Sequence, residues 1–320
     1  MADIKLFSAK IIGTGHYVPE NILTNKYLSE KLELSEDWIF SRCGINNRRI
    51  CSENENTSDL ALKASESALL SANISASEID LIIFCTTTPD KLCPSTASKL
   101  QSELNTINAS GFDLNSACAG FIYGFSVAYQ FIATGMYKTV LIVGSEAMSK
   151  TIDDSDKSTS ILFGDGAGAV ILQRSEEEKF INFSLGLDGS KRDLIDMNFK
   201  KDELYPKLRM IGKSVFKWSL SFLPSFILDT LKKSNLSLDD IDYFIFHQAN
   251  KRIIDSVISK LEIPENKVLT NIEDYGNTSS ASIPIILSES LEKEIIKKND
   301  KLFLIGFGAG ISWGACILEF

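Results

Sequence analysis

Residues 113–121 read Asp-Leu-Asn-Ser-Ala-Cys-Ala-Gly-Phe. They join two segments whose sequence patterns predict different secondary structure. The segment before them, 111–114, predicts the end of a strand, whereas the segment 121–134 predicts a helix. Cys118 is therefore expected at a strand-to-helix turn, where the N–H groups and partial positive charge of the helix favour a thiolate. Its small neighbours leave room for an acyl group to approach the sulfur. This stretch alone leaves two interpretations open, a nucleophile and a small buried thiol.

Short apolar runs alternate with helical stretches along the chain. The runs have the length of strands that are covered on both faces, and they lie at 81–84, 140–143, 167–172, 243–246, 302–305 and 314–318. Helices are expected at 56–71, with Thr57 or Ser58 as the N-cap, at 121–134 and at 214–234. This alternation predicts an α/β protein with largely buried mixed sheets.

Two pairs of segments indicate an internal repeat. Residues 79–85 (Ile-Asp-Leu-Ile-Ile-Phe-Cys) resemble residues 241–247 (Ile-Asp-Tyr-Phe-Ile-Phe-His). The glycine-rich segment 163–172 resembles the C-terminal segment 307–318. The two pairs occur in the same order along the chain, which indicates two copies of one α/β unit.

We expect the two copies to span residues 1–174 and 175–320. The charged run 175–179 between them is typical of a solvated turn. The polar stretch 186–208 has no clear period and is expected to be a long excursion, a kind of segment that often carries function.

Composition excludes several classes of protein. The 320 residues carry a formal net charge of −9, which argues against non-specific nucleic-acid binding, although a local basic patch can still bind an acidic partner. No apolar run approaches the roughly 20 residues that a membrane span needs, and the first eight residues lack the apolar core of a signal peptide, so a cytoplasmic protein is expected. The six cysteines form no C-x-x-C pair and there are two histidines, so we expect neither zinc nor disulfides.

Two further polar residues lie far from Cys118 in the sequence. His247 follows the apolar run 244–246 and is expected at a strand end, where α/β sheets meet their ligands. Asn277 follows a glycine. Each also has a plainer interpretation, a hydrogen-bonded structural histidine and a turn asparagine with positive φ. Together, a thiol, an imidazole and a carboxamide supply a nucleophile, a base or donor, and a neutral donor for an oxyanion, as acyl transfer needs.

The glycine-rich segments 164–168 and 306–310 invite comparison with nucleotide-binding loops. Neither has the dinucleotide-binding spacing with an acidic residue about 20 positions later, and no phosphate-loop lysine follows. We expect close backbone packing near an active site instead.

Three motifs together resemble the β-ketoacyl-acyl carrier protein synthase III family of the thiolase superfamily, and the resemblance runs over essentially the whole chain. They are Ala-Cys-Ala-Gly-Phe at 117–121, His-Gln-Ala-Asn at 247–250 and Gly-Asn-Thr-Ser at 276–279. The resemblance implies a thiolase-like five-layer αβαβα fold of two pseudo-repeated halves, a homodimer, and no metal or bound cofactor. The implied reaction is a decarboxylative Claisen condensation of an acyl-CoA primer with malonyl-acyl carrier protein, which initiates fatty-acid synthesis.

The same resemblance assigns roles to the polar residues. Cys118 would carry the acyl group as a thioester, with the backbone N–H groups of Cys118 and Ala309 holding the oxyanion. His247 and Asn277 would donate hydrogen bonds to the malonyl thioester oxygen and so stabilise the enolate that decarboxylation leaves.

Other positions match the family one at a time. Trp38 and Arg42 match the CoA-binding pair, in which an indole stacks on adenine and a guanidinium binds phosphate. Arg252, with its neighbour Lys251, matches the basic site that docks the acidic carrier protein. Phe307 matches an aromatic beside the reacting centre.

Three positions depart from the family pattern. Lys157 stands where an arginine usually faces the adenine, and Lys213 stands where an asparagine usually meets the pantetheine arm. Cys93 replaces a bulky residue that reaches across the dimer and forms the floor of the partner's acyl pocket. The smaller side chain predicts a deeper pocket and a primer other than acetyl, either longer or branched.

Three rival functions remain open. An acyltransferase or condensing enzyme of specialised metabolism shares the fold, and the departures around the CoA site favour it. An inactive partner subunit is disfavoured because the thiol, imidazole and carboxamide are all intact. A cysteine hydrolase is disfavoured because small residues around the thiol suit an acyl tunnel, and because condensation needs water excluded.

Overall fold

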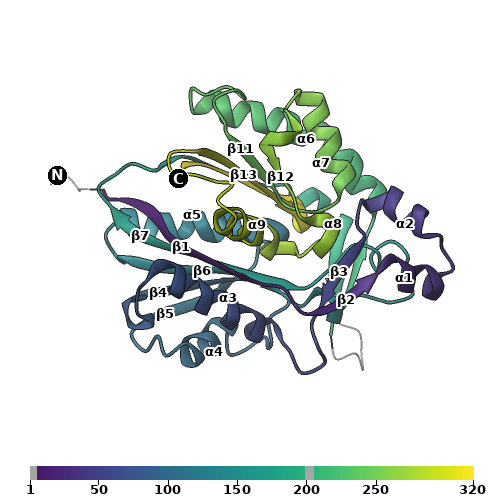
Figure 1. Cartoon of the computed structure of the whole chain (residues 1–320), viewed down its shortest axis with the longest axis horizontal. Helices are drawn as coiled ribbons and strands as arrows, with labels where there is room; N and C mark the ends of the chain where they lie inside the picture. Colours follow the sequence, from purple (N-terminus) through teal and green to yellow (C-terminus); the bar gives the residue numbers. More distant parts are fainter. Residues whose placement is uncertain (1–5, 199–204) are drawn as a thin grey trace.

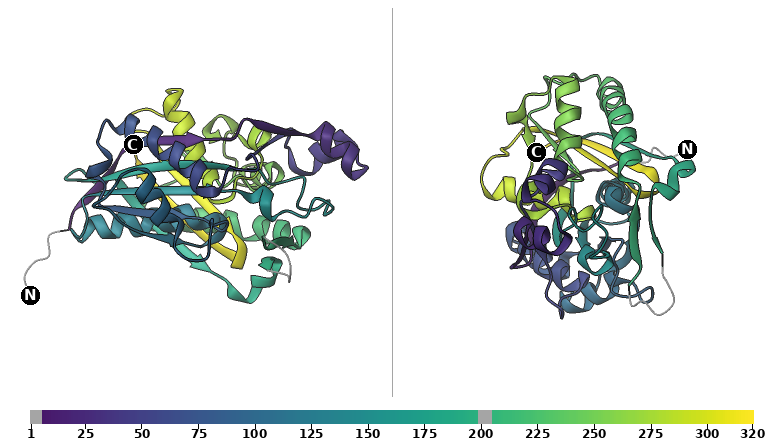
Figure 2. Two further views of the ribbon diagram at one scale, coloured as in Figure 1. Left: turned by 90° about the horizontal axis from the view of Figure 1, so that it is seen from below. Right: turned by 90° about the vertical axis from the view of Figure 1, so that its right-hand side faces the viewer.

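The computed structural model describes residues 6–198 and 205–320. They form two five-stranded sheets stacked one above the other, with helices between the sheets and on both outer faces (Figures 1 and 2). All six sequence-predicted strands lie inside observed strands.

The first sheet has the strand order β1-β7-β6-β4-β5. These strands are β1 (Ser8–Tyr17), β4 (Leu81–Cys85), β5 (Ser110–Leu114), β6 (Thr139–Glu146) and β7 (Gly166–Ser175). β1 and β6 each pair antiparallel with β7, whereas β4 pairs parallel with β6 and β5. β4 and β6 are buried at every residue, which is why their sequences are apolar without alternation.

The second sheet has the order β12-β11-β13-β14-β8. Its strands are β8 (Phe180–Leu187), β11 (Tyr243–Phe246), β12 (Val268–Leu269), β13 (Lys301–Gly308) and β14 (Ser312–Glu319). β8 and β13 pair antiparallel with β14, and β11 pairs parallel with β13 and β12. Strand for strand, this repeats the order and directions of the first sheet. The repetition supports the halves 1–174 and 175–320, whose boundary stays a prediction.

Helices supply the other three layers. Between the sheets lie α5 (Gly120–Ala133) and α9 (Ser282–Glu292), which contact strands of both sheets (Figure 1). The outer face of the first sheet is covered by α3 (Thr57–Ala72) and α4 (Thr96–Glu103), and that of the second by α6 (Gly212–Lys233) and α7 (Lys251–Leu261). The predicted five-layer αβαβα fold is confirmed.

Smaller elements gather near one end of the sheets. The antiparallel pair β2 (Asn21–Thr24) and β3 (Asn47–Ile50) brackets α1 (Asn25–Leu32) and α2 (Glu36–Cys43), and α8 (Ile272–Tyr275) lies nearby. The predicted excursion 186–208 contains a structured part, because β9 (Ile195–Asn198) pairs antiparallel with β10 (Lys207–Met210). Its residues 199–204 lie outside the described residues. A separate apolar core joins these elements through Ile39, Ile161 and Leu208.

Helix boundaries differ from the prediction in detail. The N-cap of α3 is Asn56, because its side chain accepts from the backbone of the first turn while Asp59 Oδ2 accepts from the Asn56 N–H at 2.7 Å. The prediction of Thr57 or Ser58 was therefore wrong by one or two residues. A reciprocal pair of this kind satisfies two otherwise free N–H groups, which decides where the helix begins.

The glycine-rich segments do pack closely, as expected. A β-carbon on Gly168 would lie 2.6 Å from the N atom of Ile285, and one on Gly164 would lie 2.2 Å from the carbonyl oxygen of Tyr275. Both contacts join the first half of the chain to the second. The predicted solvated turn 175–179 is exposed at residues 176–178 only, because Ser175 is buried at the end of β7 and Lys179 forms an ion pair with Glu319 at 3.0 Å.

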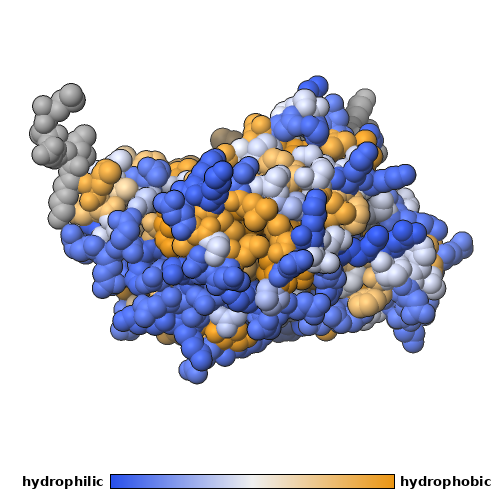
Figure 3. All heavy atoms as spheres, turned by 90° about the horizontal axis from the view of Figure 1, so that it is seen from above, coloured by the Kyte–Doolittle hydropathy of each residue, from blue (hydrophilic) through white to orange (hydrophobic). Residues whose placement is uncertain are grey.

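Several general properties follow from the described residues. None of their helices combines the length and apolar character needed to cross a membrane. Within 6–198 and 205–320, no three His, Cys, Asp or Glu side chains are grouped so that they could hold a metal ion. All six cysteines are free. Figure 3 shows apolar side chains gathered in the middle of one face, among hydrophilic surroundings.

Candidate active site

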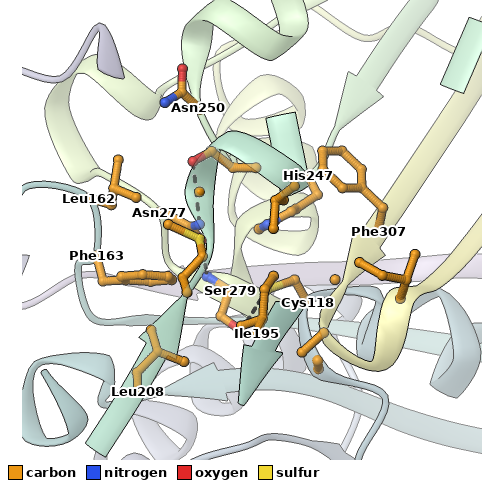
Figure 4. Close-up of a pocket in the computed structure, with 18 of the residues that line it drawn as sticks. Cys118, Leu162, Phe163, Ile195, Leu208, His247, Asn250, Asn277, Ser279 and Phe307 are labelled. Carbon is orange, nitrogen blue, oxygen red and sulfur yellow. Dashed lines mark hydrogen bonds between the residues drawn. The ribbon is translucent and has the colours of Figure 1, made fainter. Parts of the chain in front are cut away.

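A cavity of about 1050 Å³ opens where the carboxyl ends of strands from both sheets meet. Most of the predicted site residues line it, namely Trp38, Arg42, Cys118, Lys157, Lys213, His247, Arg252, Asn277, Phe307 and Ala309. Figure 4 shows Cys118, His247 and Asn277 around one space, with Phe307 beside the imidazole. Cys118 thus meets His247, which lies 129 positions later in the sequence, and Asn277, which lies farther still, at one site, as the motifs predicted.

Two predicted residues do not line this cavity. Cys93 is exposed in the single chain. Lys251 forms an ion pair with Asp255 at 2.7 Å on the surface of α7, next to Arg252. In one copy of the chain, the structure therefore brings neither residue to the cavity.

Cys118 lies in a tight turn, the 3-10 segment η2 (Ala117–Ala119), between β5 and α5. Ala117 adopts a left-handed φ of 49°, which turns the chain sharply before the helix. A β-carbon on Gly308 would lie 2.6 Å from the N atom of Cys118, so only glycine lets the end of β13 approach this turn. That contact places the backbone around Ala309 against the nucleophile.

The same turn occurs a second time in the chain. The 3-10 segment η6 (Ser279–Ala281) precedes α9 as η2 precedes α5, and Ser279 has a φ of 51°. The two turns contact each other in the middle of the molecule. Ser279 approaches the nucleophile, since its Oγ lies 3.4 Å from Cys118 Sγ.

The sequence-based expectation of a thiolate at Cys118 is not supported. Burial raises the pKa of the Cys118 thiol to about 12, and the negative charge of Glu146 adds to the rise. Taking an anion out of water outweighs the favourable partial charge at the start of a helix. Burial and the Glu146 charge therefore favour the thiol over the thiolate, and the hydrogen bond with Ser279 acts in the opposite direction.

His247 follows β11 and is 1% exposed. Its ring meets Phe307 edge to face at a centroid distance of 5.4 Å, and Nδ1 lies 2.8 Å from the Ser282 hydroxyl. Burial lowers the pKa of His247 to about 3, so the imidazole is neutral at neutral pH. A neutral imidazole donates through one nitrogen and accepts through the other.

The amide of Asn277 is held from both sides. Its Oδ1 accepts from the backbone N–H of Ser279 at 2.9 Å, and its Nδ2 donates to the carbonyl oxygen of Ala249 at 3.4 Å. These partners point the NH₂ group toward the cavity, where one N–H is left for a ligand. The simpler interpretation, a turn asparagine with positive φ, is wrong, because Gly276 is the residue with a φ of 71°.

Cationic and aromatic side chains surround the cavity mouth. The Arg42 guanidinium lies 5.2 Å from the centroid of the partly exposed Trp38 ring, and Arg252 lies 5.1 Å from that of Phe216. Asn250 caps α7 and donates to the carbonyl oxygen of Arg42 at 3.0 Å, which ties α2 to the start of α7. With Lys157 and Lys213, these groups give a positive entrance on an acidic protein.

Sequence reasoning missed three residues around the reacting groups. Ser279 and Ser282 lie within or just after the third motif, whose serines gave no signal that separated them from a polar turn. Glu146 ends the apolar strand β6 and is fully buried near Cys118. The available sign was weak: a carboxylate three positions after the apolar run 140–143, within reach of the same strand.

Two family models match the chain. The model of 3-oxoacyl-(acyl carrier protein) synthase III matches residues 112–189, and the model of its C-terminal part matches residues 231–320. The chain is 44% identical to the β-ketoacyl-acyl carrier protein synthase III of Clostridium acetobutylicum, over 98% of each chain. The chain belongs to the 3-oxoacyl-(acyl carrier protein) synthase III family. It is thus an enzyme of the condensing acyltransferase class, and the resemblance seen in its motifs is confirmed.

Solved structures of the family share the fold throughout. The synthase III of Aquifex aeolicus has a TM-score of 0.93 and 40% identity, covering 98% of this chain and all of its own. The priming β-ketosynthase of the R1128 polyketide pathway has a TM-score of 0.94 and 34% identity, covering 100% of this chain and 98% of its own. The thiolase-like architecture therefore extends over both halves.

Proposed function

We propose that the chain catalyses the decarboxylative Claisen condensation of an acyl-CoA primer with malonyl-acyl carrier protein, giving 3-oxoacyl-carrier protein, CoA and carbon dioxide. The observation that carries this proposal is the meeting of Cys118, His247 and Asn277 in one cavity, with both potential donors neutral. The family membership of the whole chain supports it.

In the first step, the Cys118 sulfur attacks the acyl-CoA carbonyl. The new bond joins that sulfur to the acyl carbon, the bond from that carbon to the CoA sulfur breaks, and the thiol proton ends on CoA. The N–H groups of Cys118 and Ala309 would stabilise the oxyanion between these events. The close approach of Gly308 to the Cys118 backbone supports this pairing.

In the second step, the malonyl group loses carbon dioxide and becomes an enolate. His247 and Asn277 would each donate a hydrogen bond to its thioester oxygen, and neutral donors suit an enolate because they add no competing negative charge. The carbanion then attacks the acyl carbon, and the sulfur of Cys118 leaves as a thiolate, which takes up one proton from solvent to restore the thiol. Fatty-acid initiation is the expected setting of this reaction.

The cavity mouth fits two acidic substrates. Trp38, Arg42, Lys157 and Lys213 would bind CoA, whose phosphates meet the cationic side chains and whose adenine meets the indole. Arg252 and Lys251 on α7 would dock the acyl carrier protein. We expect no nucleic acid or membrane partner and no cofactor, and a cytoplasmic location stays a prediction.

We also propose a homodimer. β5 is the last strand of the first sheet, and Leu114 and Asn115 at its end line the cavity. A second copy at this edge would close that side of the cavity and give the exposed Cys93 an acyl pocket to reach. Phe307 would border the acyl group from within the same chain. Light scattering after size exclusion tests the mass directly.

The likeness to a priming β-ketosynthase of a polyketide pathway favours one second candidate, a condensing enzyme of specialised metabolism. Intact-protein mass spectrometry with a panel of acyl-CoAs, followed by malonyl-acyl carrier protein, separates the two. Loading onto Cys118 and discharge as 3-oxoacyl-carrier protein supports the synthase and identifies the primer. Loading without discharge by malonyl-carrier protein contradicts it.

A further inference from the structure

Glu146 is a carboxylate in the middle of the protein. It ends β6, is 0% exposed, and accepts hydrogen bonds on both oxygens. Its Oε2 accepts from the hydroxyls of Thr86, Thr87 and Thr88, which follow β4, and from the backbone N–H groups of Thr87 and Thr88. So many donors to one oxygen hold the side chain in a single orientation.

The other oxygen of Glu146 faces the second turn. Ser279 Oγ lies 3.0 Å and Ser280 Oγ 2.9 Å from Oε1. Ser279 Oγ also lies 3.4 Å from Cys118 Sγ, and Ser280 Oγ lies 2.9 Å from the carbonyl oxygen of Cys85. Each hydroxyl has one proton and two acceptors within reach, so the carboxylate competes with the thiol for the proton of Ser279.

That competition favours the carboxylate. An ionised acceptor binds a hydroxyl proton more strongly than a neutral sulfur. The distances of 3.0 Å to Glu146 Oε1 and 3.4 Å to Cys118 Sγ are both within hydrogen-bond range, since sulfur is the larger atom. The resulting series of hydrogen bonds runs from the Cys118 thiol to the Ser279 hydroxyl and from that hydroxyl to the Glu146 carboxylate. Ser279 then accepts from the sulfur instead of donating to it.

We infer that Glu146 is a positioning residue for the nucleophile: by holding the Ser279 proton and placing a negative charge behind it, Glu146 keeps resting Cys118 as a thiol. The inference rests on the proposed role of Cys118 as the acyl carrier. What the inference adds is that Glu146 and Ser279 together set the protonation of the Cys118 sulfur before substrate binds.

The other ionisable groups around Cys118 do not oppose Glu146. His247, after β11, is neutral because burial lowers its pKa to about 3. Asp113, on β5, acts on Cys85, where its charge raises the pKa together with burial and Glu146. From the side of β13, Cys118 meets the backbone of Gly308. Among the described residues, Glu146 is thus the charge acting on this sulfur, and it raises the pKa.

A resting thiol suits the first step of the proposed reaction. The departing CoA sulfur needs one proton, and the Cys118 thiol carries one, so the exchange balances without a proton from solvent. A thiol is also a weak nucleophile toward other electrophiles while no acyl-CoA is bound. The same two residues would therefore protect the nucleophile in the free enzyme.

Glu146→Gln should reverse the donor–acceptor direction of the hydrogen bonds that link Cys118, Ser279 and residue 146. The glutamine oxygen can keep the donors from residues 86–88, and its NH₂ group then faces Ser279 and Ser280. An NH₂ group donates to both hydroxyls, so Ser280 turns its proton to the carbonyl of Cys85 and Ser279 turns its proton to Cys118 Sγ. Each hydroxyl keeps an acceptor, so we expect the variant to fold.

The test is the pH dependence of Cys118 alkylation by iodoacetamide, followed by peptide mass spectrometry, with a short cysteine-containing peptide added to the same sample as an internal standard. We expect Glu146→Gln to lower the pH midpoint at Cys118 by about one unit or more, or roughly tenfold faster alkylation at pH 7.5. The midpoint of the added peptide should not move. An unchanged or higher midpoint at Cys118 overturns the inference.

Two further variants separate this effect from a loosened fold. Glu289→Gln removes another buried carboxylate, which accepts from Tyr275 and Asn271 away from Cys118, and should leave the Cys118 midpoint in place. Ser279→Ala should leave the pH midpoint of Cys118 alkylation unchanged or slightly lower, because Ser279 does not stabilise the thiolate in our inference. If Ser279 instead donates its proton to the sulfur, its removal should raise that midpoint. A rise with Ser279→Ala, or equal shifts in both glutamine variants, contradicts the inference. Alkylation needs no acyl substrate, so a failed condensation assay would leave this result standing.

Discussion

The Nδ1 atom of His247 lies 2.8 Å from the hydroxyl oxygen of Ser282, the first residue of α9. The same hydroxyl lies 3.0 Å from the carbonyl oxygen of Ser279 and accepts from the backbone N–H of Gln248 at 3.3 Å. The Ser282 hydroxyl has one proton and two acceptors within reach, the carbonyl oxygen of Ser279 and Nδ1 of His247. The proposed donation from His247 to a substrate oxygen requires that proton to be donated to Nδ1, because the imidazole proton then resides on Nε2. In that arrangement the start of α9 sets which nitrogen of His247 is the donor.

Replacing Ser282 by alanine tests this dependence. With the Ser282 proton donated to Nδ1, the Ser282→Ala variant should lose roughly 10- to 100-fold in condensation rate, because the tautomer with the proton on Nε2 is no longer favoured. A Ser282 that donates only to the carbonyl oxygen of Ser279 predicts no such loss. Loading of an acyl group onto Cys118 should continue. Product formation from malonyl-acyl carrier protein measures the first quantity, and intact-protein mass spectrometry the second.

The chain provides a matched control for that variant. His16, the other histidine, has its Nδ1 atom 3.0 Å from the hydroxyl of Ser288, also on α9. Ser288→Ala removes the equivalent bond away from the cavity and should leave condensation unchanged. Equal losses in both variants would show that the bonds matter for folding and not for the tautomer.

Asn277→Asp should separate the two steps of the reaction. A carboxylate in this position repels the enolate, so the condensation rate at pH 7.5 should fall by about 100-fold or more. Acyl loading should persist, and part of the condensation rate should return as the pH falls and the new carboxyl group is protonated. Single-turnover assays on preloaded enzyme from pH 5.5 to 8 check this. Full activity at pH 7.5 would remove Asn277 from the proposed mechanism.

The buried imidazole makes a stability prediction. In the unfolded chain His247 binds a proton near pH 6.5, whereas in the folded protein its pKa is about 3. The unfolded state therefore binds more protons between these values, and stability is lost as the pH falls through 6.5. Between pH 7.5 and 5.5 this costs the folded state about 1.4 kcal/mol.

Urea unfolding of the wild type and of His247→Gln at both pH values isolates this contribution. The wild type should lose about 1.4 kcal/mol more unfolding free energy than the variant over this range. The difference between the two proteins is needed because other groups titrate in both. Parallel pH dependences would mean that folding leaves the pKa of His247 unchanged.

Cys93→Phe should narrow the acyl pocket of the proposed homodimer. The variant should shift loading toward shorter acyl-CoAs, because a ring would fill space that the small side chain leaves. Leu92→Phe, at a neighbouring side chain that is 84% exposed, is the control for adding an aromatic to this loop. An unchanged chain-length preference in Cys93→Phe would place the determinant elsewhere.

The architecture and the three central residues could be predicted because their signals are local. Strands covered on both faces need continuous apolar runs, and those runs, with the helices between them, gave the sheets. The motifs around Cys118, His247 and Asn277 carried the site. Cys118 and His247 follow strands, whereas Asn277 lies in the turn between α8 and η6. The pairing of these signals across the chain rested on family resemblance, not on physical derivation.

The protonation of the site could not be predicted, because it depends on burial and on distant contacts. The turn before α5 indicated a thiolate at Cys118, but desolvation and the Glu146 charge act the other way. Glu146 and Ser279 are 133 positions apart in the sequence, and no local pattern relates them. The hydrogen bond between His247 and Ser282 likewise exists only once α9 is packed between the sheets.

The repeated turn has a consequence for how such an enzyme could arise. A half-length ancestor that paired with itself would present two identical turns across a two-fold axis, with the same side chain in each. Fusion of two gene copies removes that constraint. In this chain one turn holds Cys118 and the other holds Ser279 and Ser280, while the facing strands end in Gly308 and Glu146. The two copies of the turn would then have separate roles: one carries the acyl group on Cys118, and the other, in our inference, sets the protonation of that sulfur.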